Sequence, residues 1–516
     1  MAERTAMIPG MAAAPAGGAA GVAAPGAGAV PGQGWVSELD YAHVDELRAR
    51  VANRLATDEQ SVFARLDDES RTELIATLVV EELQQWVLHR QALGQPVPTE
   101  DVEDQIIDAT VAATGGLGRL QPLLERTDVE DIFFSGPHPT MLRLASGEMV
   151  AGPPIGSTND DVMTLMKQIS STLGGASRDF SPAQPLLAVR LKAVGELGAR
   201  LSGSIDVVPA PAGTIRIHRH ADSDLDTLTS IGMIDSPLRA FLRAMVHAQG
   251  KIAISGGTGF GKTTVLRSLA AEIPHNRMIV TIEDDRELGL HVLKRKDASG
   301  RVVTDAQGQA IPRRPPALVR AYEARPANSE GRGEITMEHL GKQALRDSPD
   351  VIIFGEARGG EVVQLLEGVT NGVGGVMFTL HAESAEGVFD RVVQLVRKAH
   401  PPLPADYALR ALTFVDVIVA VRRDRRHRRF VCEVIEVASG PLGENGYPRF
   451  QRIFAPGPDG RAVPTGHHLS PALAARLEDV GFDQSWLRPE QSDWPDWDGD
   501  VVVSERSGRT RPGQWR

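Results

Sequence analysis

The residues of this chain that could carry chemistry begin with an eight-residue motif near its middle. The pattern G-x-x-x-x-G-K-[ST] is matched by Gly256-Gly257-Thr258-Gly259-Phe260-Gly261-Lys262-Thr263. In such a loop the glycines let backbone N–H groups face a β-phosphate, and the following helix adds the positive end of its dipole. We expect Lys262 to bridge the β- and γ-phosphates and the Thr263 hydroxyl to ligate Mg²⁺. The motif therefore predicts a nucleoside triphosphate bound by residues from Gly256 to Thr264.

The sequence on either side of the motif supports this prediction. An apolar run at 252–255 is typical of a buried strand, and residues 264–272 are typical of a helix. A phosphate-binding loop requires this placement between a strand and a helix. Further strand–helix alternations before residue 400 indicate a parallel sheet flanked by helices.

Three more strand-like runs end in polar side chains, which are Glu283-Asp284, Gly355-Glu356 and Thr379-Leu380-His381. Taken singly, each acid could be a solvent-exposed side chain at the end of a strand, and the histidine could have a structural role. Because ligands of open α/β sheets bind at the carboxyl ends of strands, the set favours one site. We expect Glu356 to orient the attacking water, Glu283 to assist it, and His381 to sense the γ-phosphate. Either acid is a candidate to reach the Mg²⁺ through water.

In order and spacing these residues resemble one known family, the type II/type IV secretion and pilus-assembly ATPases. The loop at 256–263, Glu283-Asp284, Gly355-Glu356 with Arg358, and Thr379-Leu380-His381-Ala382 look like its Walker A, Asp box, Walker B and His box. The resemblance covers about residues 116–440. Three further stretches are similar to the CpaF-like Tad/Flp pilus branch: Gly116-Leu117-Gly118 with Leu123-Leu124, Arg325-Pro326-Ala327-Asn328-Ser329-Glu330-Gly331, and Leu345-Arg346 with Pro349-Asp350.

The resemblance implies a RecA-like hexameric motor that hydrolyses ATP and acts on an inner-membrane platform protein of a pilus or secretion machine. It also implies an N-terminal domain that a linker swings over the motor domain, with ATP between them. Family arginines near the nucleotide match Arg200 and Arg216 in the first domain and Arg325 and Arg358 in the second. Such an arginine neutralises charge on the transferred phosphoryl group, although each of the four also fits a surface salt bridge.

The chain departs from the family pattern at two places. Many relatives carry Gly-His-x-Gly before the His-box strand, whereas Val373 stands here in place of that histidine. A polar insertion at 294–316 separates the Asp box from Arg325. The general type II branch often carries a four-cysteine zinc module, which a chain with Cys432 as its one cysteine cannot form.

These patterns predict an α/β chain with disordered tails. We expect an Ala/Gly/Pro tail at 1–38, a helical module at 39–114, a small α/β domain at 115–221, which the resemblance places over the nucleotide, and a linker at 222–235. A RecA-like P-loop NTPase motor domain follows at 236–455, and 456–516 is expected to be a largely disordered extension. The helical module fits partner docking or plain packing equally, and the Trp/Asp-rich end fits disorder or docking.

Charge and composition exclude other classes of protein. The net charge is -12, from 55 basic and 67 acidic residues, which argues against a nucleic-acid coat held by bulk charge. No apolar run approaches ~18 residues and the N-terminus lacks a signal-peptide pattern, so we expect a cytoplasmic protein, at most peripheral to the membrane. The basic run at 422–429 fits an exposed hairpin turn, or a contact for acidic lipid or a membrane partner.

The leading hypothesis is a cytoplasmic, hexameric ATP-hydrolysing motor that powers pilus assembly or protein secretion at the inner face of the membrane. One alternative is a conjugative DNA-transfer ATPase, which would use the same motor residues. A second alternative is a nucleotide-gated scaffold with little turnover, which Val373 motivates and the intact Lys262, Glu356 and His381 oppose.

Overall fold

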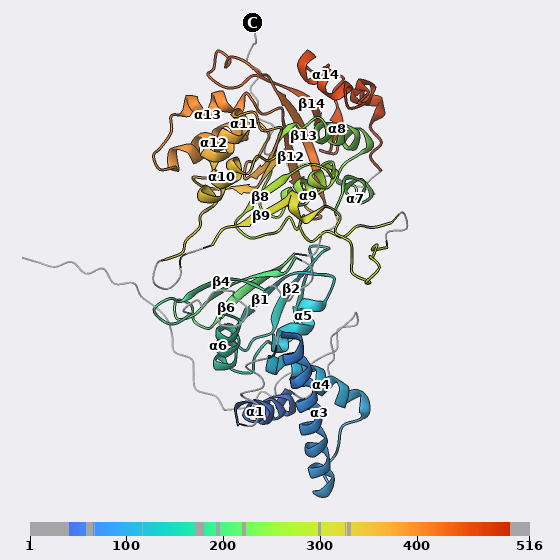
Figure 1. Ribbon diagram of the computed structural model, residues 1–516, viewed down its shortest axis with the longest axis vertical. Coiled ribbons are helices and arrows are strands. Elements are labelled where there is room, and N and C mark those ends of the chain that lie inside the picture. Colours follow the sequence, from blue (N-terminus) through green and yellow to red (C-terminus); the bar gives the residue numbers. More distant parts are fainter. Residues whose placement is uncertain are drawn as a thin grey trace, which may run out of the picture.

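The computed structural model shows two α/β bodies stacked along the long axis, with a helical module at the far end of the first (Figure 1). It describes residues 41–57, 66, 68–115, 117–170, 180–191, 197–218, 223–297, 301–325, 327 and 332–495. The predicted tail at 1–38 and the end of the chain from 496 lie outside these residues. In the described ranges, no helix has the length and apolar character needed to cross a membrane.

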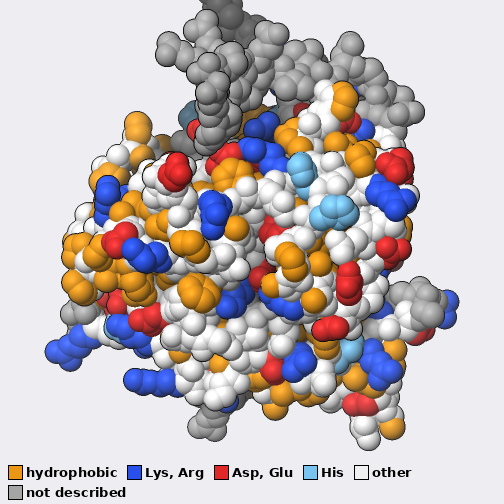
Figure 2. All heavy atoms as spheres, turned by 90° about the horizontal axis from the view of Figure 1, so that it is seen from above, with side chains coloured by type: hydrophobic (Ala, Val, Ile, Leu, Met, Phe, Trp, Pro, Cys, Tyr) orange, Lys and Arg blue, Asp and Glu red, His pale blue; other side chains and the backbone are white. Residues whose placement is uncertain are grey.

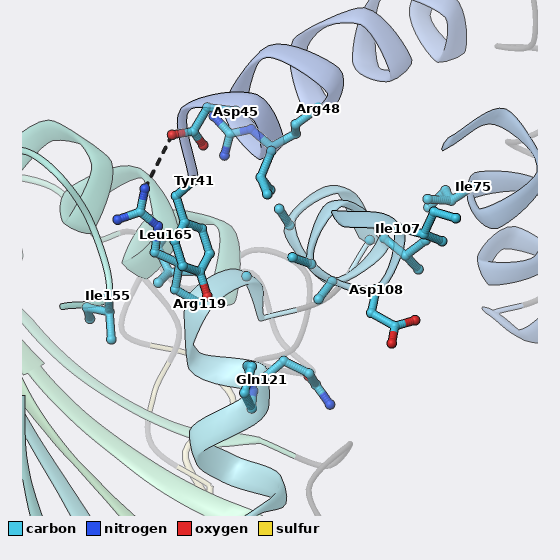
Figure 3. A pocket seen from close by; sticks show the side chains of 18 of the residues that line it. Tyr41, Asp45, Arg48, Ile75, Ile107, Asp108, Arg119, Gln121, Ile155 and Leu165 are labelled. Atoms are coloured by element: carbon cyan, nitrogen blue, oxygen red, sulfur yellow. Dashed lines mark hydrogen bonds and ion pairs between the residues drawn. The ribbon is translucent and has the colours of Figure 1, made fainter. Parts of the chain in front are cut away.

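The N-terminal module consists of helices, as its periodicity predicts. They are α1 (Tyr41–Thr57), α3 (Asp68–Ala92) and α4 (Glu100–Gly115). Apolar residues recur on one face of each helix and meet in two small buried clusters, one around Trp86 and one around Val79. The module contacts the next domain through Arg119, whose guanidinium lies 4.2 Å from the Tyr41 ring centre and 3.4 Å from the Asp45 carboxylate (Figure 3). A cavity of about 1040 Å³ lies between the two beside this contact, and Tyr41, Asp45 and Arg119 are among the residues that line it.

The small α/β domain is built on a six-stranded antiparallel sheet with the order β3-β2-β1-β6-β5-β4. Its elements are η1 (Gly118–Leu120), α5 (Gln121–Glu125), β1 (Val129–Ser135), β2 (Thr140–Leu144), β3 (Met149–Gly152), α6 (Asn159–Gln168), β4 (Leu186–Leu191), β5 (Ala199–Ser204) and β6 (Ala212–Ile217). Helix α6 starts at a capping box made by Thr158 and Asp161. Its Val162 and Met166 are buried against the sheet, so the apolar face of the helix closes the core.

The predicted linker is attached to the motor domain along most of its length. It contains α7 (Leu225–Ser230), whose first turn is capped by the Asp224 carboxylate. Leu225, Leu228 and Met233 are buried in the motor core. From Leu225 onward the linker is therefore packed as part of the motor domain.

The motor domain contains a nine-stranded sheet with the order β15-β14-β13-β12-β7-β11-β10-β8-β9. The six strands from β12 to β9 in this order are parallel, and β13, β14 and β15 add antiparallel pairs at one side. Their bounds are β7 (Lys251–Ser255), β8 (Ile279–Glu283), β9 (Val319–Glu323), β10 (Val351–Ala357), β11 (Gly375–Leu380), β12 (Val417–Arg423), β13 (Arg429–Val437), β14 (Phe450–Pro456) and β15 (Ala462–Pro464). The predicted parallel α/β architecture is confirmed.

Helices cover both faces of this sheet (Figure 1). One face carries α7, α8 (Ser236–His247), α9 (Lys262–Glu272) and α14 (Pro471–Glu478). The other carries α10 (Met337–Arg346), α11 (Val362–Thr370), α12 (Gly387–Lys398) and α13 (Ala405–Leu412). The parallel strands are buried on both sides, which explains why they appear in the sequence as continuous apolar runs.

The insertion at 294–316 is anchored to the end of α9. Isolated bridges pair Lys294 with Pro312 and Thr304 with Ala310, so the two arms of the insertion run antiparallel. The buried guanidinium of Arg314 donates hydrogen bonds to the carbonyls of Ile273 and Pro274. A cation at the carbonyl end of a helix is stabilising. Arg314 therefore attaches the end of the insertion to the C-terminal end of α9.

The C-terminal part corrects the expectation of a largely disordered extension. Strand β14 crosses the predicted boundary at 455, and β15, α14, η4 (Gln484–Leu487) and η5 (Pro489–Gln491) follow it. Leu477 is fully buried in the motor core, and the rings of Phe482 and Phe241 lie 5.8 Å apart. The Trp494 indole donates to the Ala462 carbonyl at 2.7 Å. The core positions of this segment are few and lie far apart among acidic residues and prolines, so the sequence shows no apolar periodicity there.

We predict that Leu477→Ala lowers the free energy of unfolding of the motor domain by about 2–5 kcal/mol, because it empties a fully buried position. Val480→Ala, at a position that is 37% exposed, should change it by less than about 0.5 kcal/mol. Denaturant unfolding followed by circular dichroism measures both variants. Equally small losses in the two would contradict the packing of this segment on the motor core.

Candidate active site

The phosphate-binding loop joins the central strand β7 to α9. Gly256, Gly259 and Gly261 have φ angles of 155°, 73° and 94°, which side-chain-bearing residues rarely adopt. A Cβ on Gly256 would also lie 2.7 Å from the carbonyl oxygen of Val421. No side chain caps α9 at Gly261, so the first N–H groups of this helix face the loop. The backbone thus forms a cradle for phosphate oxygens.

The polar ends of three other strands meet beside this loop. Strand β11 pairs with β7, β10 pairs with β11, and β8 pairs with β10, all in parallel register. Their carboxyl ends therefore lie along one edge of the sheet. Glu283 ends β8, Glu356 lies near the end of β10, and His381 follows β11. The structure therefore places these three residues at one edge of the sheet, as predicted.

Lys262, His381 and Glu356 form a continuous chain of contacts. The Lys262 ammonium lies 3.1 Å from the Gly257 carbonyl and 3.2 Å from His381 Nδ1. His381 Nε2 lies 2.5 Å from Glu356 Oε1. Because an ammonium can only donate, Nδ1 is the accepting nitrogen, and in the neutral ring the proton is then on Nε2, the nitrogen close to Glu356. The histidine thus connects the lysine of the loop to the carboxylate two strands away.

The pKa values in this chain follow from burial and charge. Burial lowers the pKa of the Lys262 ammonium to about 8, although the Glu356 carboxylate opposes the shift. Burial alone would raise the pKa of Glu356, but the hydrogen bond and charge of Arg358, with His381 and Lys262, hold it below the usual value. Burial, and then the charge of Lys262, lower the pKa of His381. At neutral pH the site therefore holds an ionised carboxylate beside a neutral imidazole.

Arg358 holds the other side of Glu356. Its guanidinium donates to Glu356 Oε2 and lies 3.8 Å from Asp284. The strand is irregular here, because the register of β10 with β11 shifts between Phe354 and Ala357. This irregularity brings Glu356 and Arg358 to the site side by side.

Glu283 makes contacts that differ from those expected of a water-activating acid. Its side chain is buried, one oxygen accepts from the Thr281 hydroxyl at 3.0 Å, and the other accepts from the N–H groups of Glu287 and Leu288, both at 2.8 Å. Burial raises the pKa of Glu283 to about 7. Gly355 leaves room for this side chain, since a Cβ there would lie 3.0 Å from Glu283 Cγ. In this structure Glu283 shapes the loop that follows β8.

A cleft of about 850 Å³ lies between the two bodies at this edge. It brings together six of the predicted residues, which are Thr263, Glu283, Glu356, Arg358, Arg325 and Arg200. Arg325 lies at its outer part, where its guanidinium donates to the Gly333 carbonyl at 2.8 Å. The N-terminal domain contributes Arg200 and Arg190 from its strands β5 and β4.

The arginines of the first domain have carboxylate partners. Arg200 forms an ion pair with Asp285 of the motor domain. Arg190, which belongs to none of the sequence motifs, lies 3.2 Å from Glu323. Arg216 pairs within its own domain with Asp131 at 2.8 Å and lies outside the residues that line the cleft. The acidic run that begins at Glu283 could have indicated Asp285, whereas no local pattern marks Arg190.

The residues present fit a Mg²⁺ ion that is held mainly by phosphate oxygens and water. The described residues contain no group of three or more His, Cys, Asp and Glu side chains that could hold a metal. Thr263 lies in the first turn of α9 and lines the cleft, and in such sites Mg²⁺ typically takes one or two protein oxygens beside phosphates.

Comparisons with known proteins identify a family and several similar chains. The sequence profile of the family described as "Type II/IV secretion system protein" matches residues 193–431, which include the loop, Glu283, Glu356 and His381. A Mycobacterium tuberculosis protein named for conjugal transfer is 32% identical over 324 residues, which cover 62% of this chain and 84% of that protein. The type IV secretion system protein PtlH of Bordetella pertussis is 29% identical over 357 residues, covering 62% and 94%. A crystal structure of the Brucella suis VirB11 ATPase with sulphate is 22% identical, covers 61% of this chain and 91% of its own, and has a TM-score of 0.30.

The burial of Glu283 leads to a prediction about pH. The unfolded chain releases this proton near 4.5 and the folded chain near 7, so stability falls as the pH rises between these values. The loss is roughly 3 kcal/mol at 1.4 kcal/mol for each pH unit. Glu283→Gln keeps the hydrogen-bonding shape and should remove this part of the pH dependence.

The measurement is denaturant unfolding at pH 5 and pH 7.5 for wild type, Glu283→Gln and Asp284→Asn. Asp284 is the exposed neighbour and serves as the control. We expect a smaller loss of stability between the two pH values in Glu283→Gln than in the other two proteins. An unchanged pH dependence in Glu283→Gln would show that this carboxyl is ionised in the folded protein across the whole range.

Proposed function

The chain belongs to the type II/IV secretion system ATPase family, and on that premise we propose that it is a cytoplasmic, hexameric motor powering pilus assembly or protein secretion. Membership of this family implies nucleotide binding and ATP hydrolysis. In the proposal the motor acts on an inner-membrane platform protein, and it belongs to the CpaF-like Tad/Flp branch. The stretches at 325–331 and 345–350 support that branch.

The observation that carries the proposal is the chain of contacts from Lys262 through His381 to Glu356. A lysine in a phosphate-binding loop neutralises the β- and γ-phosphates. The 3.2 Å contact with His381 Nδ1 gives this ammonium a second partner at the neighbouring strand end. A γ-phosphate that takes over the ammonium releases His381, and the imidazole then responds to the state of the nucleotide. This supports the predicted sensing role of His381.

Glu356 is suited to orient the attacking water. Its lowered pKa keeps the carboxylate ionised at neutral pH, so it accepts a hydrogen bond from water. Arg358 donates a hydrogen bond to Glu356 Oε2, and His381 Nε2 lies 2.5 Å from Glu356 Oε1, so groups on both sides restrict the direction of the carboxylate. In the proposed mechanism Glu356 aligns the water, while Glu283 keeps the neighbouring loop in place rather than acting on the water itself.

Arginines from both bodies are placed to neutralise the phosphates. Arg325 and Arg358 come from the motor domain and Arg200 from the first domain, and all three line the same cleft. Closure of the two bodies brings Arg200 from Asp285 toward the nucleotide. Arg216 has the same proposed role only after it leaves Asp131. When Mg²⁺ is bound by Thr263 and the phosphates, it supplies further charge neutralisation.

A conjugative DNA-transfer motor is the second candidate. The Mycobacterium tuberculosis relative named for conjugal transfer favours it, and the same residues would hydrolyse ATP. The net charge of -12 gives no general attraction for DNA. The face shown in Figure 2 likewise mixes acidic, basic and hydrophobic side chains without a field of one sign. We therefore place pilus assembly or protein secretion first.

We predict that Glu356→Gln binds ATP but lowers the rate of phosphate release at least 100-fold, because the amide cannot align water as the carboxylate does. Binding is measured with a fluorescent ATP analogue, and turnover by phosphate release from the same preparation. Glu383→Gln, at an exposed acid close to His381, is the matched control and should hydrolyse ATP like the wild type.

Turnover at the wild-type rate in Glu356→Gln would contradict the role of this residue. Tight ATP binding by the wild type with no phosphate release would instead favour the nucleotide-gated scaffold that the valine at position 373 suggests.

A further inference from the structure

The basic turn between β12 and β13, residues 422–429, lies beside the phosphate-binding loop. Strand β12 runs parallel to β7 with Ala420 opposite Ser255, the last residue of β7, and continues to Arg423 beside the phosphate-binding loop. The carbonyl oxygen of Val421 packs against Gly256, the first glycine of the loop. The turn therefore begins where the phosphate-binding loop begins.

Asp424 holds this turn in a defined shape. Its carboxylate accepts hydrogen bonds from the N–H groups of Arg426 and Arg428, both at 2.9 Å, and from the Arg428 guanidinium at 2.7 Å. The backbone N–H of Asp424 also donates to the Arg428 carbonyl at 3.0 Å. The turn is thus a folded element, and the side chains on its two strands keep fixed directions.

Arg423 places a cation over the phosphate-binding loop. Its guanidinium carbon lies 5.7 Å from the centre of the Phe260 ring, and one of its nitrogens lies 3.7 Å from the Cβ position of Gly259. Among the described residues, no carboxylate forms an ion pair with Arg423, in contrast to Arg428 and Arg429. An arginine at this distance from the loop can donate to an oxygen of a bound phosphate.

The other strand of the turn contacts the first domain. Both terminal nitrogens of Arg429 donate to the Glu130 carboxylate of β1, at 3.2 and 3.4 Å. His427 fits against Gly147 in the turn between β2 and β3, where a Cβ would lie 2.8 Å from His427 Cβ. Next to Arg429, the Val431 N–H donates to the carbonyl of Met233 in the linker at 2.9 Å. The turn therefore contacts the loop and the first domain, and strand β13, which follows it, contacts the linker.

We infer that the turn at 422–429 couples the bound nucleotide to the first domain. Arg423 binds a phosphate oxygen of the nucleotide in the loop, and this contact shifts the turn. Arg429 and His427 transmit the shift to Glu130 and Gly147. The inference rests on the proposed function, because it requires a nucleotide in the loop, and it gives the basic run a role other than an exposed surface.

The first test is binding of a fluorescent ADP analogue to the full chain. Arg423→Gln should weaken binding about tenfold or more, because it removes one charge-assisted hydrogen bond. Arg425→Gln, at an exposed arginine of the same turn, is the matched control and should change the dissociation constant by less than about twofold. Arg423→Lys keeps the positive charge but lacks the planar guanidinium. Its dissociation constant should therefore lie between those of Arg423→Gln and Arg425→Gln. Thermal unfolding of each variant checks that it is folded.

The second test follows the distance between the two bodies. Burial raises the pKa of the native Cys432 thiol to about 12, so cysteines introduced at the exposed Ser202 and Ser439 label selectively with fluorescent dyes. We expect ATP to change energy transfer between the dyes in the wild type. Glu130→Arg or Arg429→Glu should abolish this change and lower kcat more than KM. The double variant, with the charges exchanged, should regain at least half of the change.

The outcomes separate this inference from the function on which it rests. If the wild type fails to bind the ADP analogue, the proposed function is wrong, and the coupling role falls with it. If the wild type binds and Arg423→Gln binds equally well, the role of Arg423 alone is overturned. If ATP changes energy transfer in the charge-exchanged double variant no more than in the single variants, the Arg429–Glu130 pair does not transmit the shift.

Discussion

The ammonium of Lys262, held between the Gly257 carbonyl and the His381 imidazole, is the interaction on which the rest of the site depends. It exists because β7 and β11 are adjacent and parallel, so a loop residue after one strand meets the residue that follows the other. The next parallel strand, β10, then brings Glu356 to the far side of the same imidazole. Burial makes these contacts matter, since a partly desolvated cation and carboxylate need partners.

A second constraint is the placement of charges across the cleft between the two bodies. Arg200 meets Asp285, Arg190 meets Glu323, and Arg429 meets Glu130, so each body holds the other through ion pairs. Such pairs in a solvent-accessible cleft are individually weak, which suits an interface that opens and closes. A nucleotide in the cleft competes for the arginines and so changes the balance between the bodies.

Much of the motor domain could be predicted because its strands are buried on both faces and its motifs end those strands. The sequence indicates Glu356 and His381 in this way, and the parallel sheet brings them together. The contacts of Glu283 could not be predicted, because they are made by backbone N–H groups of a loop whose path the sequence does not show. The docked segment around Leu477 and the place of Arg423 over Phe260 likewise depend on contacts between residues far apart in the chain.

The most direct test of the account is phosphate release from the purified protein, resolved by assembly size, with Lys262→Ala and the exposed Lys342→Ala measured in parallel. We expect release only in a fraction of the size of a hexameric ring. We also expect loss of release in Lys262→Ala and unchanged release in Lys342→Ala. Release at the wild-type rate by Lys262→Ala, or by monomers alone, would contradict the assignment of this chain as a hexameric ATP-hydrolysing motor.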